Sequence, residues 1–348
     1  MKIAYKITYK ITYKIKYGEN MEIYEPPYKI SNSMLEKVAS ISEKLGKISN
    51  WHDLAAKPHL RRSNRIKSIY SSLRIEANSL PMSAVSGIID GKTVIGDAKE
   101  IREVKNAYNA YDKIMEINPY DINDLCMIHG YMTEGLVKES GKFRSGNEGI
   151  FDGGKCIFIA PPPNMVSVLM NDLFQWMNRM QGKLHPLIVA AIFHYEFVFI
   201  HPFADGNGRM ARLWHTALLA KWKKIFLYIP MESQIEKFQT EYYEAIAKCH
   251  TKGNSNFFIE FILTRIDEII DTLIKQIEIS SGNEYVNKIL MIMETDVSYS
   301  VTELMNLLQL KSRSSFRTNY LVPALKSEKI RMTIPDKPNS RNQRYVKV

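Results

Sequence analysis

Apolar side chains recur three or four residues apart over much of the chain, which is the period of an amphipathic helix. This period predicts helices over residues 33–46, 66–78, 98–117, 165–180, 208–223, 233–249 and 257–279. It places Leu35 and Met115 on the apolar faces of their helices. The segment 184–199 is apolar on nearly every side, so we expect it to be a central buried helix.

The helical period stops between Phe143 and Pro163. Glycines surround Ile150 and Phe151, and a second apolar run, Ile157 to Ile159, ends in three prolines. Short apolar runs separated by glycine are typical of a β-hairpin, which we expect over residues 147–160. The main body is therefore predicted to be mainly α-helical with one small hairpin.

Beyond Gly282 the pattern changes again, to three short helical stretches followed by two short strand patterns at 330–334 and 344–348. Three helices and a two-stranded wing predict a winged helix-turn-helix domain over residues 281–348. At the other end, residues 1–17 repeat a four-residue unit of Tyr, Lys, Ile and Thr. We expect residues 1–20 to be a disordered, low-complexity tail, with Met21 as the start of the functional protein.

Composition limits the class of protein. The chain has 348 residues, 45% of them apolar, and a formal net charge of +10, which suits an anionic partner such as a nucleotide, a nucleic acid or an acidic protein surface. Its three cysteines, Cys126, Cys156 and Cys249, form neither a disulfide framework nor a zinc pattern, so we expect a reducing cytoplasm. No apolar stretch suggests a membrane span or a secretion signal.

The strongest chemical signal is the segment from His201 to Arg212, which reads HPFADGNGRMAR. Gly206 and Gly208 allow a tight turn that brings backbone N–H groups to an anion at the start of the next helix. Two arginines three residues apart, Arg209 and Arg212, add permanent positive charge for phosphate oxygens. The segment therefore predicts a site for a di- or triphosphate.

Two further residues of this segment supply the remaining chemistry. Asp205 can hold Mg²⁺, which takes few protein carboxylates and completes its shell with phosphate and water. His201 can accept a hydroxyl proton near neutral pH. The spacing does not match a P-loop, and the remaining histidines lack the spacing of metal ligands, so we interpret them as structural.

The segment resembles the motif of the Fic family, in which His, Phe, an acidic residue, Gly-Asn-Gly-Arg and a second Arg stand at these positions. The resemblance implies that the protein transfers AMP from ATP to a Ser, Thr or Tyr hydroxyl of a target protein. It implies His201 as the general base, Asp205 as the Mg²⁺ ligand and Asn207 as a phosphate-orienting side chain. Arg209 would contact the inner phosphates and Arg212 the γ-phosphate, and Phe203 would be a buried anchor.

The resemblance extends beyond this segment. The hairpin 147–160 resembles the flap that positions the target protein in that family, which would require no target side-chain sequence; a hairpin that only covers the core is the alternative. Tyr242 and Tyr243 would line the adenine site, or else pack in the core. The implied domains are an N-terminal helical region at 21–97, a Fic catalytic core at 98–280 and the winged-helix-like domain at 281–348.

A second resemblance concerns residues 72–78, which are similar to the inhibitory helix of Fic proteins. Ser72 precedes Glu76 by four residues, as in that pattern, and the helix is expected around residues 65–78. Ala77 departs from the Gly or Asn that the pattern requires, and Asn78 is expected to supply a left-handed cap. The resemblance implies that Glu76 pairs with Arg212 and holds the protein inactive; an ordinary exposed helix glutamate is the alternative.

The C-terminal domain leaves the partner open. A DNA-facing surface is one interpretation, built from Arg313, Arg317, Lys337, Arg341, Arg344 and Lys347. Against it, Pro323 interrupts the third helix, so protein docking or self-association as a homodimer is the other interpretation. The functional alternatives to a protein AMP-transferase are therefore a DNA-binding regulator with a nucleotide-sensing core, or an enzyme that removes AMP or transfers another group.

Overall fold

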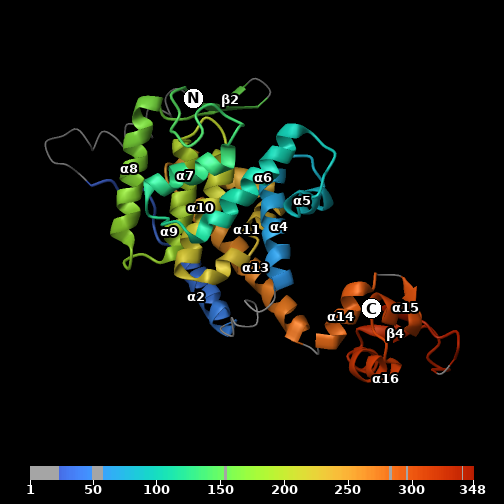
Figure 1. Ribbon diagram of the computed structural model, residues 1–348. Helices are drawn as coiled ribbons and strands as arrows, with labels where there is room; N and C mark the ends of the chain where they lie inside the picture. The colour runs from blue at the N-terminus through green and yellow to red at the C-terminus, as the bar shows by residue number, and fades with distance from the viewer. Residues whose placement is uncertain (1–22, 49–57, 153–154, 282–283, 295–296, 339) are drawn as a thin grey trace. The chain divides into compact units, whose positions relative to one another are not determined.

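A computed structural model describes residues 23–48, 58–152, 155–281, 284–294, 297–338 and 340–348. The repeat at residues 1–17 and the predicted tail 1–20 lie outside these residues. The chain divides into two compact units, one ending at Asp271 and the other beginning at Thr272 (Figure 1). Within the described part of the chain, no helix is both long and apolar enough to span a bilayer.

The first unit is almost entirely helical. Its helices are α2 (Asn32–Lys47), α4 (Pro58–Ile75), α5 (Met82–Ile89), α6 (Ala98–Asp112), α7 (Ile122–Thr133), α8 (Pro163–Met180), α9 (Pro186–Ile200), α10 (Asn207–Trp222), α11 (Met231–Lys237), α12 (Gln239–Lys252) and α13 (Asn256–Ser281), which continues past the boundary between the units. Short 3₁₀ turns follow α6 at Lys113–Met115 and α10 at Lys224–Tyr228.

The core of this unit is centred on α9. Every residue of α9 from Leu187 to Phe197 is buried, which confirms the predicted central helix. Helices α8 and α10 pack against α9, and Figure 1 shows the three together. Because the loop 201–206 joins α9 directly to α10, the segment 201–212 is held by two largely buried helices.

The predicted hairpin is present. Strands β1 (Gly149–Asp152) and β2 (Lys155–Ile159) pair antiparallel, with Gly149 opposite Ile159 and an irregularity between Ile150 and Phe151. The ring of Phe158 in β2 stacks on His250 of α12 at a centroid distance of 4.5 Å. This contact fastens one strand of the hairpin to the helical body.

Some expectations about the helices were wrong. The single helix expected over 233–249 is two helices, because Phe238 leaves the helical conformation and its ring lies 4.0 Å from the guanidinium of Arg265. Leu35 and Met115 are exposed rather than on buried faces. Helices α5 and α7 have no counterpart among the predicted helices.

The second unit combines short helices with a small sheet. Its elements are α14 (Glu284–Ile292), β3 (Ser298–Tyr299), α15 (Val301–Leu307), α16 (Arg313–Ser315), the π-helical turn η3 (Phe316–Leu321), α17 (Val322–Lys326), β4 (Ile330–Met332) and β5 (Tyr345–Lys347). The two predicted strands pair antiparallel as β4 and β5, and β3 adds an unexpected third strand in the order β3-β5-β4.

The helical path through α16, η3 and α17 continues across Pro323, where an interruption was expected. The N–H of Val322 donates to the carbonyl of Arg317, a π-type bond that widens the turn just before the proline. Pro323 then occupies the first turn of α17, where its missing N–H costs little. Phe316 and Leu321 are buried in a core formed with Ile289, Leu304 and Ile330.

Candidate active site

The loop between α9 and α10 has two residues in the left-handed backbone region. His201 ends α9 with φ 52° and ψ 59°, and Gly206 precedes α10 with φ 80°. A Cβ on Gly206 would lie 3.1 Å from the methyl group of Thr133, so both the dihedral angle and the space require glycine. The turn directs the first N–H groups of α10 toward one point, which is the geometry of an anion site.

An amide clamp holds the loop in this shape. The Asn207 side chain accepts a hydrogen bond from the N–H of Phe203 at 2.9 Å and donates one to the carbonyl of the same residue at 2.7 Å. Asn207 was expected to orient a phosphate, but both of its polar groups are committed to the main chain of Phe203. The Phe203 ring is fully buried, as expected for an anchor.

His129 on α7 supports the same loop. Its ring stacks on Phe203 with a centroid distance of 3.6 Å and an interplanar angle of 4°. Its Nδ1 accepts from the N–H of Gly141 at 2.9 Å, so the proton of the neutral ring is on Nε2, which donates to the Asp205 carbonyl at 3.0 Å. Burial lowers the pKa of His129 to about 4, so this tautomer persists at neutral pH.

His201 is arranged to act as a base. Its Nδ1 lies 3.4 Å from the carbonyl of Val198, which can only accept, so the ring proton belongs on Nδ1. The lone pair is then on Nε2. Burial lowers the pKa of His201 below its ordinary value, which keeps the imidazole neutral at pH 7.

Arg209 is a buried cation whose donors are incompletely used. Its side chain is 3% exposed, and Nη2 donates to Oδ2 of Asp205 at 3.1 Å. Its Nε and Nη1 are buried and have no hydrogen-bond acceptor among the described residues, although Nη1 lies 3.8 Å from a carboxylate oxygen of Glu103 on α6. Leaving such donors unsatisfied is costly, so the site is suited to an incoming anion.

Arg212, one helical turn further on, is paired with the segment 72–76. Its Nε donates to the hydroxyl of Ser72 at 3.1 Å, and Nη2 donates to the Ser72 carbonyl at 3.0 Å and to Oε1 of Glu76 at 2.7 Å. Burial alone would lower the pKa of Arg212, but the Glu76 carboxylate raises it above its ordinary value. The expected pair of Glu76 with Arg212 is therefore present, and Ser72 of the same segment contacts this guanidinium as well.

The Glu76 carboxylate also lies above the start of α10. A Cβ on Gly208 would overlap Oε1 of Glu76 and approach Nη1 of Arg212 to 3.0 Å. Glycine at this position therefore leaves the space that the carboxylate fills. A negative charge at a helix N-terminus is stabilised by the helix dipole, and a phosphate would be held there by the same N–H groups.

The end of the Glu76 segment differs from the expectation. Ala77, not Asn78, has the left-handed conformation, with φ 66°. The N–H groups of Ala77 and Asn78 donate to the carbonyls of Arg74 and Leu73 in a Schellman arrangement. Asn78 instead anchors the segment, because its side-chain amide donates to Glu103 at 2.9 Å.

Arg144 is a site residue that sequence reasoning missed. It is buried, and its guanidinium donates to the carbonyls of His201 at 2.7 Å, Gly146 at 2.7 Å and Pro161 at 2.6 Å. It thus joins the end of α9 to both ends of the hairpin. Its place just before the hairpin was the only sequence signal, since periodicity does not distinguish a buried arginine from an exposed one.

The two tyrosines proposed for an adenine site lie in different environments. Tyr242 is 2% exposed, and its hydroxyl lies 3.0 Å from Nε2 of His194. A ring buried to this extent cannot present a face to a base, so Tyr242 has the packing role that was the alternative. Tyr243 is 49% exposed and stays a candidate for contact with a base.

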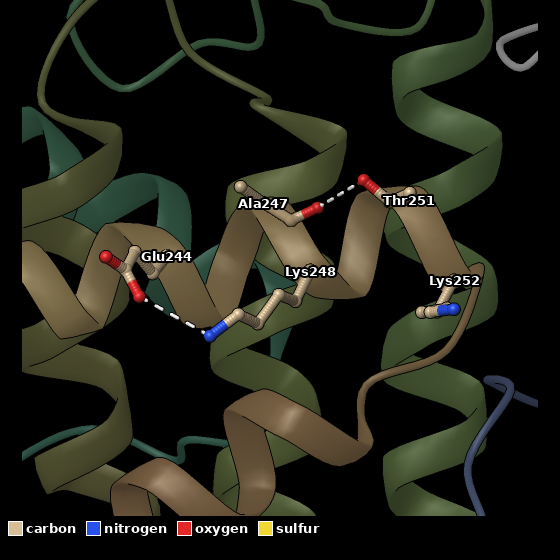
Figure 2. Close-up of a pocket in the computed structure, with 5 residues that line it drawn as sticks. All are labelled: Glu244, Ala247, Lys248, Thr251 and Lys252. Atoms are coloured by element: carbon tan, nitrogen blue, oxygen red, sulfur yellow. Dashed lines mark hydrogen bonds and ion pairs between the residues drawn. The ribbon is translucent and has the colours of Figure 1, made fainter.

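A surface hollow on α12 is separate from these groups. Figure 2 shows its lining residues, Glu244, Ala247, Lys248, Thr251 and Lys252. Lys248 pairs with Glu244 at 3.4 Å, and the Thr251 hydroxyl donates to the Ala247 carbonyl. None of the loop residues lines this hollow, and most of its polar groups are paired with each other, so it is not the candidate site.

Two protein-family models match the chain. Residues 119–219 match the Fic/DOC family, and residues 284–346 match the C-terminal domain of the Fic-like proteins described as filamentation induced by cAMP. Curated relatives include the protein adenylyltransferase Fic of Drosophila mojavensis, 29% identical over 68% of this chain, and that of Culex quinquefasciatus, 31% identical over 66%. In both cases the match covers 46% of the relative, so this chain spans about half the length of the curated relatives that it matches.

Solved structures give the same result. A Fic family protein from Desulfovibrio desulfuricans G20 is 39% identical, with a TM-score of 0.70 over 93% of this chain and 98% of that one. Residues 134–508 of Fic-1 from C. elegans share the fold, with a TM-score of 0.54, 20% identity and coverage of 70% and 74%. With a match that spans nearly the whole of both chains in the first case, and with a mainly helical Fic fold, this chain belongs to the Fic family.

Proposed function

We propose that this protein transfers AMP from ATP to a hydroxyl side chain of another protein, and that Glu76 holds it inactive. The observation that carries the proposal is the anion site at the start of α10. There the backbone turn at Gly206 adjoins Arg209, a buried guanidinium in which two nitrogens, Nε and Nη1, have no acceptor among the described residues. A phosphate chain supplies acceptors for these donors, and the adenylyltransferase names of the curated relatives support ATP as its source.

In the proposed reaction a target hydroxyl oxygen bonds to the α-phosphorus of ATP. The bond from this phosphorus to the oxygen that bridges to the β-phosphate breaks, and pyrophosphate leaves. His201 takes the hydroxyl proton on Nε2, because Nδ1 carries the ring proton that faces Val198. Arg209 neutralises the inner phosphates, and Arg212 receives the γ-phosphate once it is free of Glu76.

Asp205 fits the metal role in this scheme. Its side chain is 45% exposed, and its carboxylate accepts one hydrogen bond from the N–H of Gly206 and one from Arg209. Two lone-pair positions therefore remain for a cation. Mg²⁺ typically uses one or two carboxylates with substrate phosphates, and it would supply charge neutralisation for the departing pyrophosphate.

Autoinhibition is supported by the competition for Arg212. Glu76 forms a 2.7 Å ion pair with this guanidinium and fills the space over Gly208. A γ-phosphate and the Glu76 carboxylate cannot both occupy that position. The proposed inhibitory helix, around residues 65–78 of the N-terminal region 21–97, belongs to the same chain and would therefore act on the 98–280 core at high effective concentration.

The hairpin is proposed to hold the target segment. Its two strands pair only with each other among the described residues, which leaves main-chain groups on their outer edges for an added strand. Arg144 links both ends of the hairpin to the carbonyl of His201, so the docked segment would be in fixed relation to the base. Docking through the main chain would give broad target specificity.

The decisive experiment compares the parent protein with Glu76→Gly, using ATP labelled on the α-phosphate and a bacterial lysate as the source of targets. We expect Glu76→Gly to increase label on protein at least about 10-fold, including self-modification, because Arg212 becomes available. Glu36→Gly on the exposed face of α2 is the matched control and should leave labelling unchanged.

The double variant Glu76→Gly/His201→Ala is the negative control. Its rate of labelling should be about 10²- to 10⁴-fold lower than that of Glu76→Gly, while its affinity for ATP is retained. Equal labelling of the parent and Glu76→Gly would exclude inhibition by this residue. Absence of label in every variant, with loss of AMP from a pre-modified protein, would favour the alternative direction of the reaction. If protein were labelled by another nucleotide and not by ATP, the transferred group would be one other than AMP.

A further inference from the structure

We propose that the unit beginning at Thr272 binds duplex DNA, through the exposed face of α16 and η3 together with the connection between β4 and β5. This surface is separate from the AMP-transfer site, and the inference does not depend on the proposed function. It rests on how the structure sorts the basic residues of this unit into committed and exposed ones.

Positive charge is concentrated at the end of the chain. Residues 311–348 carry ten Lys and Arg residues against two acidic ones, Glu328 and Asp336. The helical segment formed by α16, η3 and α17, residues 313–326, contains no acidic residue. A local excess of this size attracts polyanions and is the electrostatic footprint of a nucleic-acid site.

Two residues expected on this surface are committed elsewhere. Arg344 donates to the hydroxyl and carbonyl of Ser298 and pairs with Glu303 at 2.8 Å, which ties β5 to β3 and α15. Lys347 donates to the carbonyls of Leu290 and Met293 at the end of α14. We therefore correct the expectation: these two side chains hold the unit together and do not belong to the binding surface.

The remaining basic residues are exposed. Arg313 and Arg317 lie four residues apart on the helical segment, and Ser314 and Thr318 between and beside them are also exposed. On the opposite side, Phe316 and Tyr320 are buried in the core, which fixes the orientation of the segment. The exposed face therefore presents guanidinium and hydroxyl groups from one helical segment.

The same surface continues to the sheet. Burial raises the pKa of Tyr345, the first residue of β5, while the charges of Arg317 and Arg313 oppose the rise. Arg331, Lys337 and Arg341, in β4 and in the connection that follows it, are exposed. Figure 1 shows this connection extending away from the helices of the unit.

This arrangement fits a duplex. An α-helix fits the major groove, where arginine contacts base edges and hydroxyl groups contact bases or phosphates. Basic residues on an extended strand connection would then meet the neighbouring phosphates, which set the register but carry no sequence information. The short helix α15 begins with a capping box between Ser300 and Glu303. It precedes the helical segment as in a helix-turn-helix.

A protein partner fits this face less well. The core of a protein–protein interface is usually apolar and depleted of charge. None of the described residues in the helical segment 313–326 or in the connection 333–344 has a large, exposed apolar side chain, whereas Leu307 and Val348, outside this face, are exposed. The face offers charge and hydroxyl groups without an apolar centre, which favours a phosphate backbone over an acidic protein.

The test measures binding of the full chain to a fluorescein-labelled 30-base-pair duplex of random sequence, by fluorescence anisotropy at 50 mM NaCl. We expect a micromolar dissociation constant and a logarithmic salt slope of roughly −3 to −4, equivalent to about four phosphate contacts. Arg313→Glu/Arg317→Glu should weaken binding about 10- to 100-fold with an unchanged melting temperature. Arg313→Gln/Arg317→Gln should weaken it about 3- to 10-fold, and this variant serves if the charge reversal disturbs folding.

The matched control is Lys105→Glu/Lys183→Glu, which makes the same change in net charge at exposed positions of the first unit. It should alter affinity less than about 2-fold, and this comparison separates the surface from the five lysines of residues 1–17. Equal loss in both double variants would overturn the proposal, as would absence of binding by the parent. Tighter binding of labelled poly-glutamate than of the duplex, lost in Arg313→Glu/Arg317→Glu, would identify an acidic protein as the partner instead.

Discussion

The two units of this protein use charged groups in opposite ways. In the first unit Arg209 and Arg212 are buried, and their surroundings are set by Asp205, Ser72 and Glu76. In the second unit Arg313 and Arg317 are exposed to solvent. A buried guanidinium is useful only for a ligand of matching shape, whereas an exposed one serves any phosphate within reach.

Histidine use shows the same difference. All eight histidines precede residue 272, so the second unit has none. Burial lowers the pKa values of six histidines of the first unit, those of His129, His185, His194, His201, His215 and His250. The stability of the first unit should therefore change as pH falls below neutrality, whereas the second unit has no histidine to produce such a change.

The largest expected effect follows from these histidines. A group whose pKa is lower in the folded than in the unfolded state stabilises the fold above its unfolded pKa and loses this contribution as pH falls. For His215, with a folded pKa of about 4, the loss between pH 6.5 and 4 is on the order of 3 kcal/mol. Glu196 and Glu232 act oppositely, because burial raises their pKa values, but six imidazoles outweigh two carboxyl groups.

We therefore expect the first unit to unfold at a lower urea concentration at pH 5 than at pH 7, and the second unit to be nearly unaffected. All four tryptophans precede residue 272, so tryptophan fluorescence reports the first unit alone. Hydrogen exchange of peptides from residues 297–338 reports the second. A common shift of both units with pH would contradict the comparison.

A smaller effect should distinguish the two kinds of arginine by exchanging each for lysine. In the Glu76→Gly background, Arg212→Lys should lower kcat/KM for labelled AMP transfer on the order of 10²-fold, because the single ammonium of lysine lacks the planar, spread donors with which Arg212 contacts Ser72 and would hold a γ-phosphate. Arg313→Lys/Arg317→Lys should change duplex affinity less than about 3-fold, since phosphate neutralisation requires only charge. Similar tolerance of lysine at both sites would break the comparison.

How much of this could be predicted from the sequence depends on the range of the interactions. The loop 201–212 was identifiable because its shape is set by neighbours in sequence, such as the Asn207 side chain on Phe203. The central helix 184–199 and the hairpin were also predicted, from local periodicity and glycines. Contacts across the fold were not: Arg144 on His201, or His129 on Asp205, join residues more than fifty positions apart.

Side-chain environment was the other limit. Tyr242 and Tyr243 are adjacent in sequence, yet one is 2% and the other 49% exposed. Among the basic residues of the second unit, sequence could not separate Arg344, which is tied to Ser298 and Glu303, from the exposed Arg341. Spacing along a helix shows which residues share a face, but what packs against that face is determined by tertiary structure.

The smallest expected effect concerns backbone strain at two helix ends that have the same conformation in different units. Ala77 has φ 66° beside Glu76, and Gln309 has φ 55° after α15 in the second unit. Glycine adopts this conformation without a Cβ penalty, so Ala77→Gly and Gln309→Gly should each stabilise their own unit by about 0.5–1 kcal/mol. Only Ala77→Gly should also reduce labelling by the otherwise unchanged protein, because it stabilises the segment that presents Glu76 to Arg212.

Tryptophan fluorescence during urea unfolding measures the stability of the first unit, hydrogen exchange measures that of the second, and incorporation of labelled AMP measures activity. If Gln309→Gly reduced labelling as much as Ala77→Gly, inhibition would depend on general stability rather than on the Glu76 contact.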